Sequence, residues 1–190
     1  YSGICISSTD GLISVGGVWD KLLKNYCQGK RTEPAWVIGD ANLYLAGQNK
    51  IRFYLDNVFS VSKISSPEVL GAIKKGQFYV RFKTDEKDIT LAEFSFYDAL
   101  DGRKVYAGEE LVTASNLGII RIHGEAKGDP GQDKINVELI KDGNIVFQKA
   151  DLPIGEFDLR PSDTEISQAK SFYRLKISSN SGVWLLSNPI

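Results

Sequence analysis

The strongest constraint on the fold is a change in hydrophobic pattern near residue 83. From there on, apolar and polar residues alternate in short runs separated by turn residues, as in Leu91–Ala99 and Leu117–Ala126. Such alternation is typical of strands with one buried face. Lys134–Ala150 contains Asp142-Gly143 between two alternating halves, a dipeptide favoured in two-residue hairpin turns. Six or seven strands of this kind predict an antiparallel immunoglobulin-like β-sandwich over residues 83–190.

The segment just before this change follows a different pattern. Ser65–Phe82 predicts one helix followed directly by a strand. Ser65 and Glu68 have the spacing of a capping box, and Pro67 suits the first helical turn. Gly76 suits the left-handed residue that ends a helix.

Nearer the N-terminus, Trp19–Asn25 predicts a helix and Pro34–Asn42 a short apolar strand that ends in polar residues. If the chain stays extended, Asp40 and Asn42 project from the same face, because strand side chains alternate with period two. A carboxylate and an amide oxygen suit Ca²⁺ or Mg²⁺ better than Zn²⁺. Gly39, Asp40 and Asn42 are equally suited to a turn that ends the strand. Both interpretations stay open at this level.

The order of these segments resembles the last part of the PHP-domain metal-dependent phosphoesterases, a polymerase-and-histidinol-phosphatase-like superfamily. In that family a helix similar to Trp19–Asn25 precedes a strand that ends in an Asp-x-His element, here Asp40-Ala41-Asn42. A segment similar to Ser65–Val80 then closes the barrel, and some members carry a sandwich after it. The end of that sandwich resembles Tyr173-Arg174 and the tail Asn188-Pro189-Ile190.

The resemblance implies a distorted (β/α)7 barrel in which His, Asp and Glu at strand ends hold two or three divalent metal ions for phosphoester hydrolysis. Asp40 matches a metal-binding Asp of the family, and Asn42 stands where the family has His. The chain contains one histidine, His123, outside the resembling segment. Multi-metal hydrolysis needs more ligands than Asp40 and Asn42 provide. We therefore expect metal ions in a longer parent protein, none held tightly by this chain, and no catalytic residue here.

The net charge and the spacing of the cysteines limit which kinds of partner and site the chain can have. The net charge is −1 and basic residues are spread along the chain, so neither nucleic acid nor an anionic membrane is indicated as a partner. Cys5 and Cys27 lack the spacing of a zinc knuckle or a redox dithiol. They form either a disulfide or two free thiols. Two cysteines do not indicate whether the protein belongs to an oxidising or a reducing compartment.

Two further sets of residues were considered as sites. In the alternating pattern of its strand, His123 lies on the face opposite Ile120 and Ile122. This predicts an exposed or rim position rather than a metal site. Six aromatic residues suggest a sugar-stacking platform, but their spacing favours core positions. These residues are Phe94, Phe96, Tyr97, Phe172, Tyr173 and Trp184.

Two hypotheses follow. In the first, residues 1–82 are the C-terminal part of a PHP-like barrel, residues 83–190 are the sandwich, and this chain alone is an inactive fragment of a phosphoesterase. In the second, the chain is a noncatalytic β-sandwich module that binds a protein or glycan partner. A partial barrel exposes strand edges, so we expect it to associate with the remainder of the barrel or with itself.

Overall fold

The computed structural model describes residues 3–6, 11–40, 43–46, 51–113, 116–163, 166 and 169–190. These residues form two helices, α1 (Val18–Cys27) and α2 (Ser66–Lys75). The first strands are β1 (Gly3–Ile6), β2 (Trp36–Gly39), β3 (Leu43–Ala46), β4 (Ile51–Phe59) and β5 (Phe78–Thr84). The later strands are β6 (Asp88–Asp98), β7 (Lys104–Tyr106), β8 (Gly118–Lys127), β9 (Lys134–Lys141), β10 (Asn144–Pro153), β11 (Gly155–Leu159), β12 (Ser162–Asp163), β13 (Tyr173–Ser179) and β14 (Trp184–Ser187).

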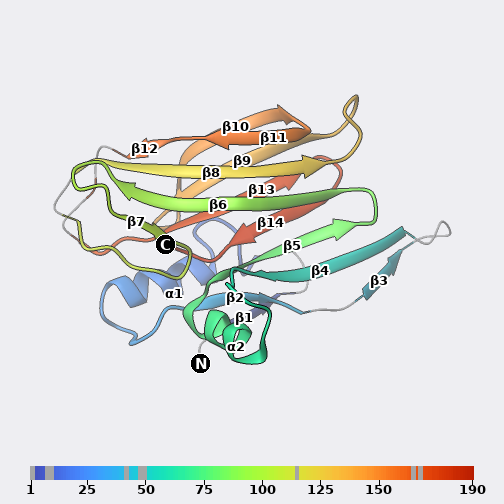
Figure 1. Ribbon diagram of the computed structural model, residues 1–190. Coiled ribbons are helices and arrows are strands. Elements are labelled where there is room, and N and C mark those ends of the chain that lie inside the picture. Colours follow the sequence, from blue (N-terminus) through green and yellow to red (C-terminus); the bar gives the residue numbers. More distant parts are fainter. Residues whose placement is uncertain are drawn as a thin grey trace.

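Most strands belong to two antiparallel sheets that face each other (Figure 1). The large sheet has the order β10-β9-β13-β14-β5-β4-β3. The smaller sheet has the order β11-β8-β6-β7, and β12 also pairs with β8. The antiparallel sheets predicted for residues 83–190 are confirmed, and most of the described secondary structure is strand.

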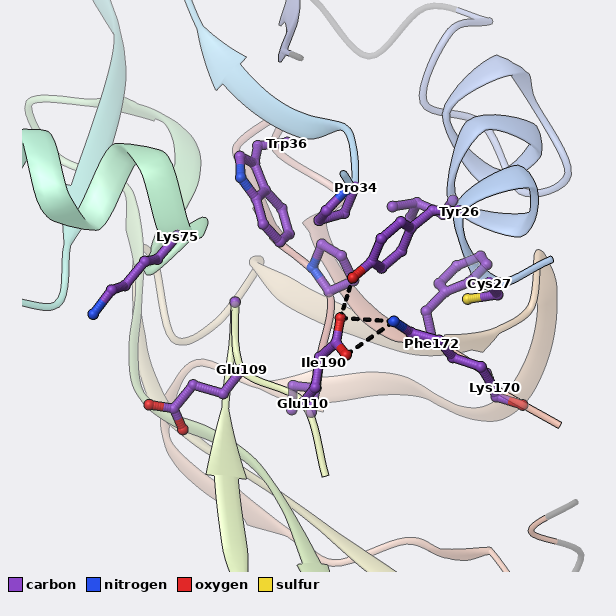
Figure 2. Close-up of a pocket in the computed structure, with 14 residues that line it drawn as sticks. Tyr26, Cys27, Pro34, Trp36, Lys75, Glu109, Glu110, Lys170, Phe172 and Ile190 are labelled. Carbon is purple, nitrogen blue, oxygen red and sulfur yellow. Dashed lines mark hydrogen bonds and ion pairs between the residues drawn. The ribbon is translucent and has the colours of Figure 1, made fainter. Parts of the chain in front are cut away.

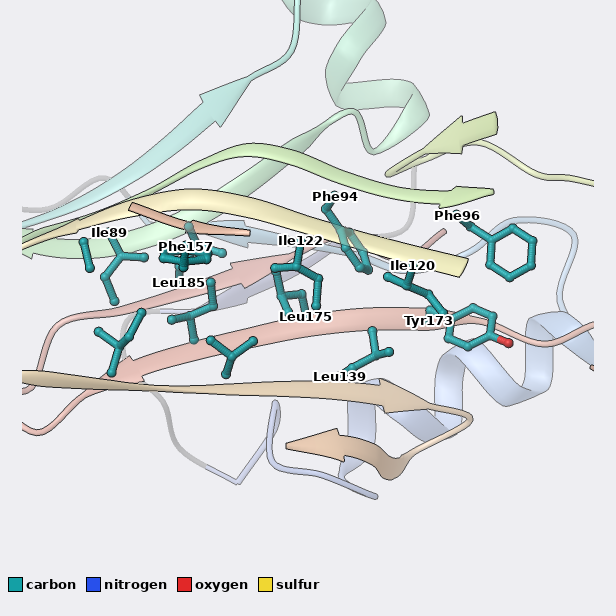
Figure 3. Close-up of a cluster of buried hydrophobic side chains, with 14 of the residues drawn as sticks. Ile89, Phe94, Phe96, Ile120, Ile122, Leu139, Phe157, Tyr173, Leu175 and Leu185 are labelled. Atoms are coloured by element: carbon teal, nitrogen blue, oxygen red, sulfur yellow. The ribbon is translucent and has the colours of Figure 1, made fainter. Parts of the chain in front are cut away.

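The main hydrophobic core fills the space between the two sheets (Figure 3). Ile120 and Ile122 project into it from β8, and Leu175 and Ile177 project into it from β13. All four side chains are fully buried. The alternation in β8 places Arg121 and His123 on the opposite face, as its sequence pattern predicts.

A second core lies on the other face of the large sheet. Strand β14 shows this directly: Leu185 belongs to the core between the sheets, whereas Trp184 and Leu186 belong to the second core. Trp19 of α1 and Val37 of β2 cover the second core. The N-terminal segment thus forms a third layer against the large sheet.

The large sheet crosses the predicted boundary between residues 82 and 83. Leu186 of β14 lies opposite Val80 of β5, and Trp184 lies opposite Phe82. β5 in turn pairs with β4. Strands from both predicted segments therefore share one continuous sheet.

Helix α2 has the predicted position. Ser65 occupies the N-cap and a proline stands in the first turn, although the Ser65 side chain makes no capping hydrogen bond. Gly76 ends the helix in the left-handed region with φ 73°. The Asp142-Gly143 turn between β9 and β10 is also confirmed, with φ 49° and 74° at its two residues.

A buried ion pair fastens α1 to the large sheet. Arg174 of β13 donates from Nε to Asp20 Oδ1 at 2.6 Å and from its NH2 group to Asp20 Oδ2 at 2.8 Å. The Arg174 side chain is 0% exposed and that of Asp20 1% exposed. The guanidinium also lies 4.8 Å from the ring centroid of Trp19. Asp20 also lies in the first turn of α1, where the helix dipole favours a carboxylate.

Candidate functional site

Asp40 lies at the carboxyl end of a parallel strand. β1 and β2 pair in parallel, with Ile6 opposite Gly39, and α1 connects them. Asp40 is the next residue after β2, its N–H donates to the carbonyl oxygen of Ile6 at 2.9 Å, and it is exposed. In β/α folds this end of a parallel strand is where ligand-binding side chains gather.

Two asparagines hold the outer edge of β2. Asn57 accepts from the Gly39 N–H at 2.8 Å and donates to the Gly39 carbonyl oxygen at 2.9 Å. Asn188 accepts from the Val37 N–H at 2.8 Å and donates to the Val37 carbonyl oxygen at 3.5 Å. Each carboxamide therefore replaces one residue of a neighbouring strand and fixes the backbone that leads to Asp40.

Asp40 is not part of a group of three potential metal ligands among the described residues. Within the described ranges, no three His, Cys, Asp or Glu side chains are grouped so that they could bind one ion. Asn42, the other predicted ligand, lies outside the described residues. Asp40 as a metal ligand stays a prediction, and a multi-metal centre would need further ligands.

A pocket of about 280 Å³ opens between α1, the end of α2, the loop after β7 and the C-terminal tail (Figure 2). Most of its wall is apolar. The apolar part is made by Leu23, Pro34, Trp36, Phe172, Pro189 and Ile190.

Tyr26, Glu110 and Lys170 form a polar cluster on one side of this pocket (Figure 2). Lys170 Nζ lies 2.8 and 2.9 Å from the two carboxylate oxygens of Glu110 and 3.9 Å from the ring centroid of Tyr26. The Tyr26 hydroxyl donates to Glu110 Oε1. Burial acts to raise the pKa of Glu110, but the hydrogen bonds from Lys170 and Tyr26 outweigh it, and the pKa lies below its usual value. The carboxylate is thus kept ionised by its two donors.

Both carboxylates of the pocket have hydrogen-bond partners. Glu109 accepts from Gln77 Nε2 at 3.3 Å and from the Tyr106 N–H at 3.0 Å, and Glu110 is paired as described above. Trp36 and Phe172 are buried residues, 8% and 4% exposed, so neither offers a broad ring face to a sugar. The geometry therefore favours an apolar group as occupant.

Both cysteines are free thiols, which resolves the alternative left open by the sequence. Cys5 is exposed on β1, and Cys27 lines the pocket. Burial raises the pKa of Cys27 to about 11, so this thiol is a weak nucleophile at neutral pH.

The other candidate residues have structural roles. His123 Nε2 lies 3.0 Å from Glu156 Oε1 on the outer face of the smaller sheet. Of the six aromatic residues, only Tyr97 is exposed, at 40%. The other five are buried, as their spacing predicts. No sugar-stacking platform is formed by these six residues.

Sequence reasoning did not identify the Tyr26–Glu110–Lys170 cluster. Glu110 is separated from Tyr26 by 84 positions and from Lys170 by 60. No periodicity or spacing connects residues at such separations, and only the packing of α1 against the sandwich brings them together.

Comparisons with protein-family models, curated proteins and solved structures find no match to this chain. No helix within the described residues is long and apolar enough to cross a membrane.

Proposed function

We propose that this chain is the C-terminal part of a PHP-like metal-dependent phosphoesterase, in which Asp40 supplies one metal ligand. One observation carries the proposal: Asp40 follows β2 directly, at the carboxyl end of a parallel β1–α1–β2 unit. A barrel of this type places its metal ligands at that end of its strands. We propose that β1, α1 and β2 are the last elements of such a barrel and that the sandwich behind them is immunoglobulin-like.

The geometry of β2 supports a positional role for Asp40. Asn57 and Asn188 occupy the edge of β2 that faces away from β1. The parallel sheet therefore ends at β2, and the other metal ligands would lie on the β1 side. Among the described residues, Asp40 belongs to no group of three His, Cys, Asp or Glu side chains that could hold a metal ion. On this account the chain alone has no hydrolase activity.

The test is an assay of the longer gene product with bis(p-nitrophenyl) phosphate and Mn²⁺. We expect Asp40→Ala to lower both bound metal and hydrolysis at least about tenfold, because loss of a ligand costs no less than loss of an outer-shell partner. Asp85→Ala, at an exposed turn carboxylate, is the matched control and is expected to change neither. Unchanged metal content and activity in Asp40→Ala would reject the proposed role, and so would hydrolysis by residues 1–190 alone.

The pocket supports a second candidate, a binding module that receives an apolar side chain of a protein partner. Its wall is mostly apolar, its two carboxylates accept hydrogen bonds from protein groups, and Trp36 and Phe172 are buried. Its volume of about 280 Å³ is close to the lower end for ligand pockets and suits one large side chain.

Amide NMR with N-acetyl-tryptophanamide as the probe tests this second function. We expect shifts at Gly108 and Ser171, which line the pocket, and none with N-acetylglucosamine. Cys27→Phe should fill the pocket and abolish the shifts, whereas Cys5→Ser should leave them unchanged. Shifts that persist in Cys27→Phe, or that appear only with the sugar, would contradict the assignment.

A further inference from the structure

A pocket of about 360 Å³ lies between β4 and β5 of the large sheet and β6 and β7 of the smaller sheet. It is found where β6 shifts register against β8, between Leu91 and Glu93. Because a bulge adds one residue to a strand, Leu91 and Phe94 both pack against the core between the sheets, and Glu93 is left at the pocket. Among the described residues, this pocket shares Glu109 alone with the pocket of Figure 2.

Five aromatic residues contribute to the wall of this pocket, which we call the aromatic pocket. They are Phe59, Phe78, Tyr79, Phe94 and Tyr106. The ring centroids of Phe59 and Phe78 lie 5.4 Å apart, and Tyr106 is 46% exposed. The faces of aromatic rings carry partial negative charge, so they attract organic cations.

The charged groups of the aromatic pocket have one sign. Of the described residues that line it, Glu93 and Glu109 are carboxylates and none is lysine or arginine. Glu93 already pairs with Lys104 and, at 3.1 Å, with Arg121. Lys104 Nζ lies 2.5 Å from Glu93 Oε1 and 5.1 Å from the ring centroid of Tyr106. One ammonium group is thus already held between a carboxylate and a ring beside the pocket.

Glu109 has no ion-pair partner within the described part of the chain. Its carboxylate accepts hydrogen bonds from two neutral donors, Gln77 Nε2 and the Tyr106 N–H. Figure 2 shows this carboxylate turned away from the Lys170 ammonium. Its negative charge can therefore attract a cation in the aromatic pocket.

We propose that the aromatic pocket binds a small molecule with a trimethylammonium group, of which choline is the simplest example. Ring faces and the Glu109 carboxylate stabilise its charge, and Val58 and Leu91 offer apolar contacts to its methyl groups. A primary ammonium is less suited, because it has three N–H donors and both oxygens of Glu109 already accept a bond. The volume of about 360 Å³ lies near the lower end of the range for small-molecule pockets.

An amide NMR titration with choline chloride tests the proposal, with sodium chloride at the same ionic strength as the blank. We expect shifts at Ala92 and Ala107, which line the aromatic pocket and not the pocket of Figure 2. The neutral analogue 3,3-dimethylbutanol has a carbon atom in place of the nitrogen, and we expect it to bind about tenfold more weakly. Equal binding of the two compounds would overturn the proposal, and so would choline shifts that are absent or confined to Gly108 and Ser171.

Substitutions then test the two kinds of contact. Glu109→Gln removes the charge at nearly constant size and should weaken choline binding about tenfold. Tyr106→Leu removes a ring and should weaken it about fivefold. Glu86→Gln, at an exposed carboxylate in the turn between β5 and β6, is the matched control and should change nothing. Unchanged affinity in both folded variants, Glu109→Gln and Tyr106→Leu, would overturn the proposal, and thermal unfolding checks that they are folded.

The inference rests on neither of the two proposed functions. Cys27→Phe, which fills the pocket of Figure 2, should leave choline binding unchanged, and so should Asp40→Ala. Loss of choline binding in Cys27→Phe would place the cation in the other pocket and overturn the assignment. The comparison of choline with its neutral analogue uses the unaltered chain, so it decides the matter even where a variant fails to fold.

Discussion

Replacement of Asp20 by Asn tests whether the buried pair with Arg174 holds the N-terminal layer against the sandwich. The substitution keeps the size of the side chain but removes its charge, and an amide NH₂ then faces the guanidinium. The Arg174 side chain is 0% exposed, so water cannot compensate for the lost carboxylate. Asp20 also accepts from the Gly16 N–H at 2.7 Å, which ties the loop before α1 to the same carboxylate.

The expected cost follows from these contacts. Removal of one partner from a buried pair costs about 3–5 kcal/mol, because the remaining charge is left uncompensated. Asn retains one oxygen that can accept a hydrogen bond, so we expect Asp20→Asn to lower the free energy of unfolding by about 3 kcal/mol, near the lower end of that range. With Arg174→Met added, the double variant should be less destabilised than the sum of the two single changes, since no buried charge then remains.

Urea unfolding followed by tryptophan fluorescence measures the change, because Trp19 lies against the Arg174 guanidinium. Asp101→Asn is the control. Asp101 pairs with Arg103 at the surface, with side chains 40% and 52% exposed, and its loss should cost less than about 1 kcal/mol. If Asp20→Asn costs no more than Asp101→Asn at an unchanged m-value, the pair does not hold the layers together.

Three further results are expected from single substitutions. Gly108→Ala places a Cβ 2.0 Å from the backbone carbonyl oxygen of Lys75 in α2, at a residue with φ 82°. In urea unfolding it should lower the free energy of unfolding by about 2 kcal/mol more than Gly182→Ala, because Gly182 has φ 90° but open space around it. Equal losses of stability in the two variants would contradict the close approach at Gly108. Asn57→Ala should speed hydrogen exchange of the Gly39 amide about tenfold or more, since its acceptor is lost; unchanged exchange would show that the carboxamide is not needed. Because the pKa of Cys27 is about 11, its thiol should react with Ellman's reagent at pH 8 roughly 100-fold more slowly than a small thiol of pKa about 9 in solution. Similar rates would contradict its burial.

Local signals in the sequence predicted the elements that depend on local geometry. α2 has its proline in the first turn and Gly76 at its end, where a left-handed residue is required. The Asp142-Gly143 turn and the alternation in β8 are equally local, and they place the hairpin and the core face. β1 was missed, because four residues carry too little periodicity and its partner β2 lies about 30 positions away.

The order of strands in the sheets and the contacts between distant residues depend on long-range pairing, which local sequence patterns could not predict. The hydrophobic period changes near residue 83, yet β14 joins β5 across that point, because sheet order depends on packing between distant strands. Arg174 and Asp20 are 154 positions apart, so their contact leaves no mark in the spacing of either residue. For the site, the sequence placed Asp40 at a strand end, whereas Asn57 and Asn188 became visible only through their bonds to β2.

The most direct test of the central claim is the coding sequence upstream of Tyr1 in the native gene. The account predicts a continuous reading frame of roughly 200 further residues, with His, Asp and Glu at strand ends, enough to complete a barrel of about 250 residues around Asp40. A start codon or a processing site immediately before Tyr1 would contradict it, because no source for the missing metal ligands would then remain.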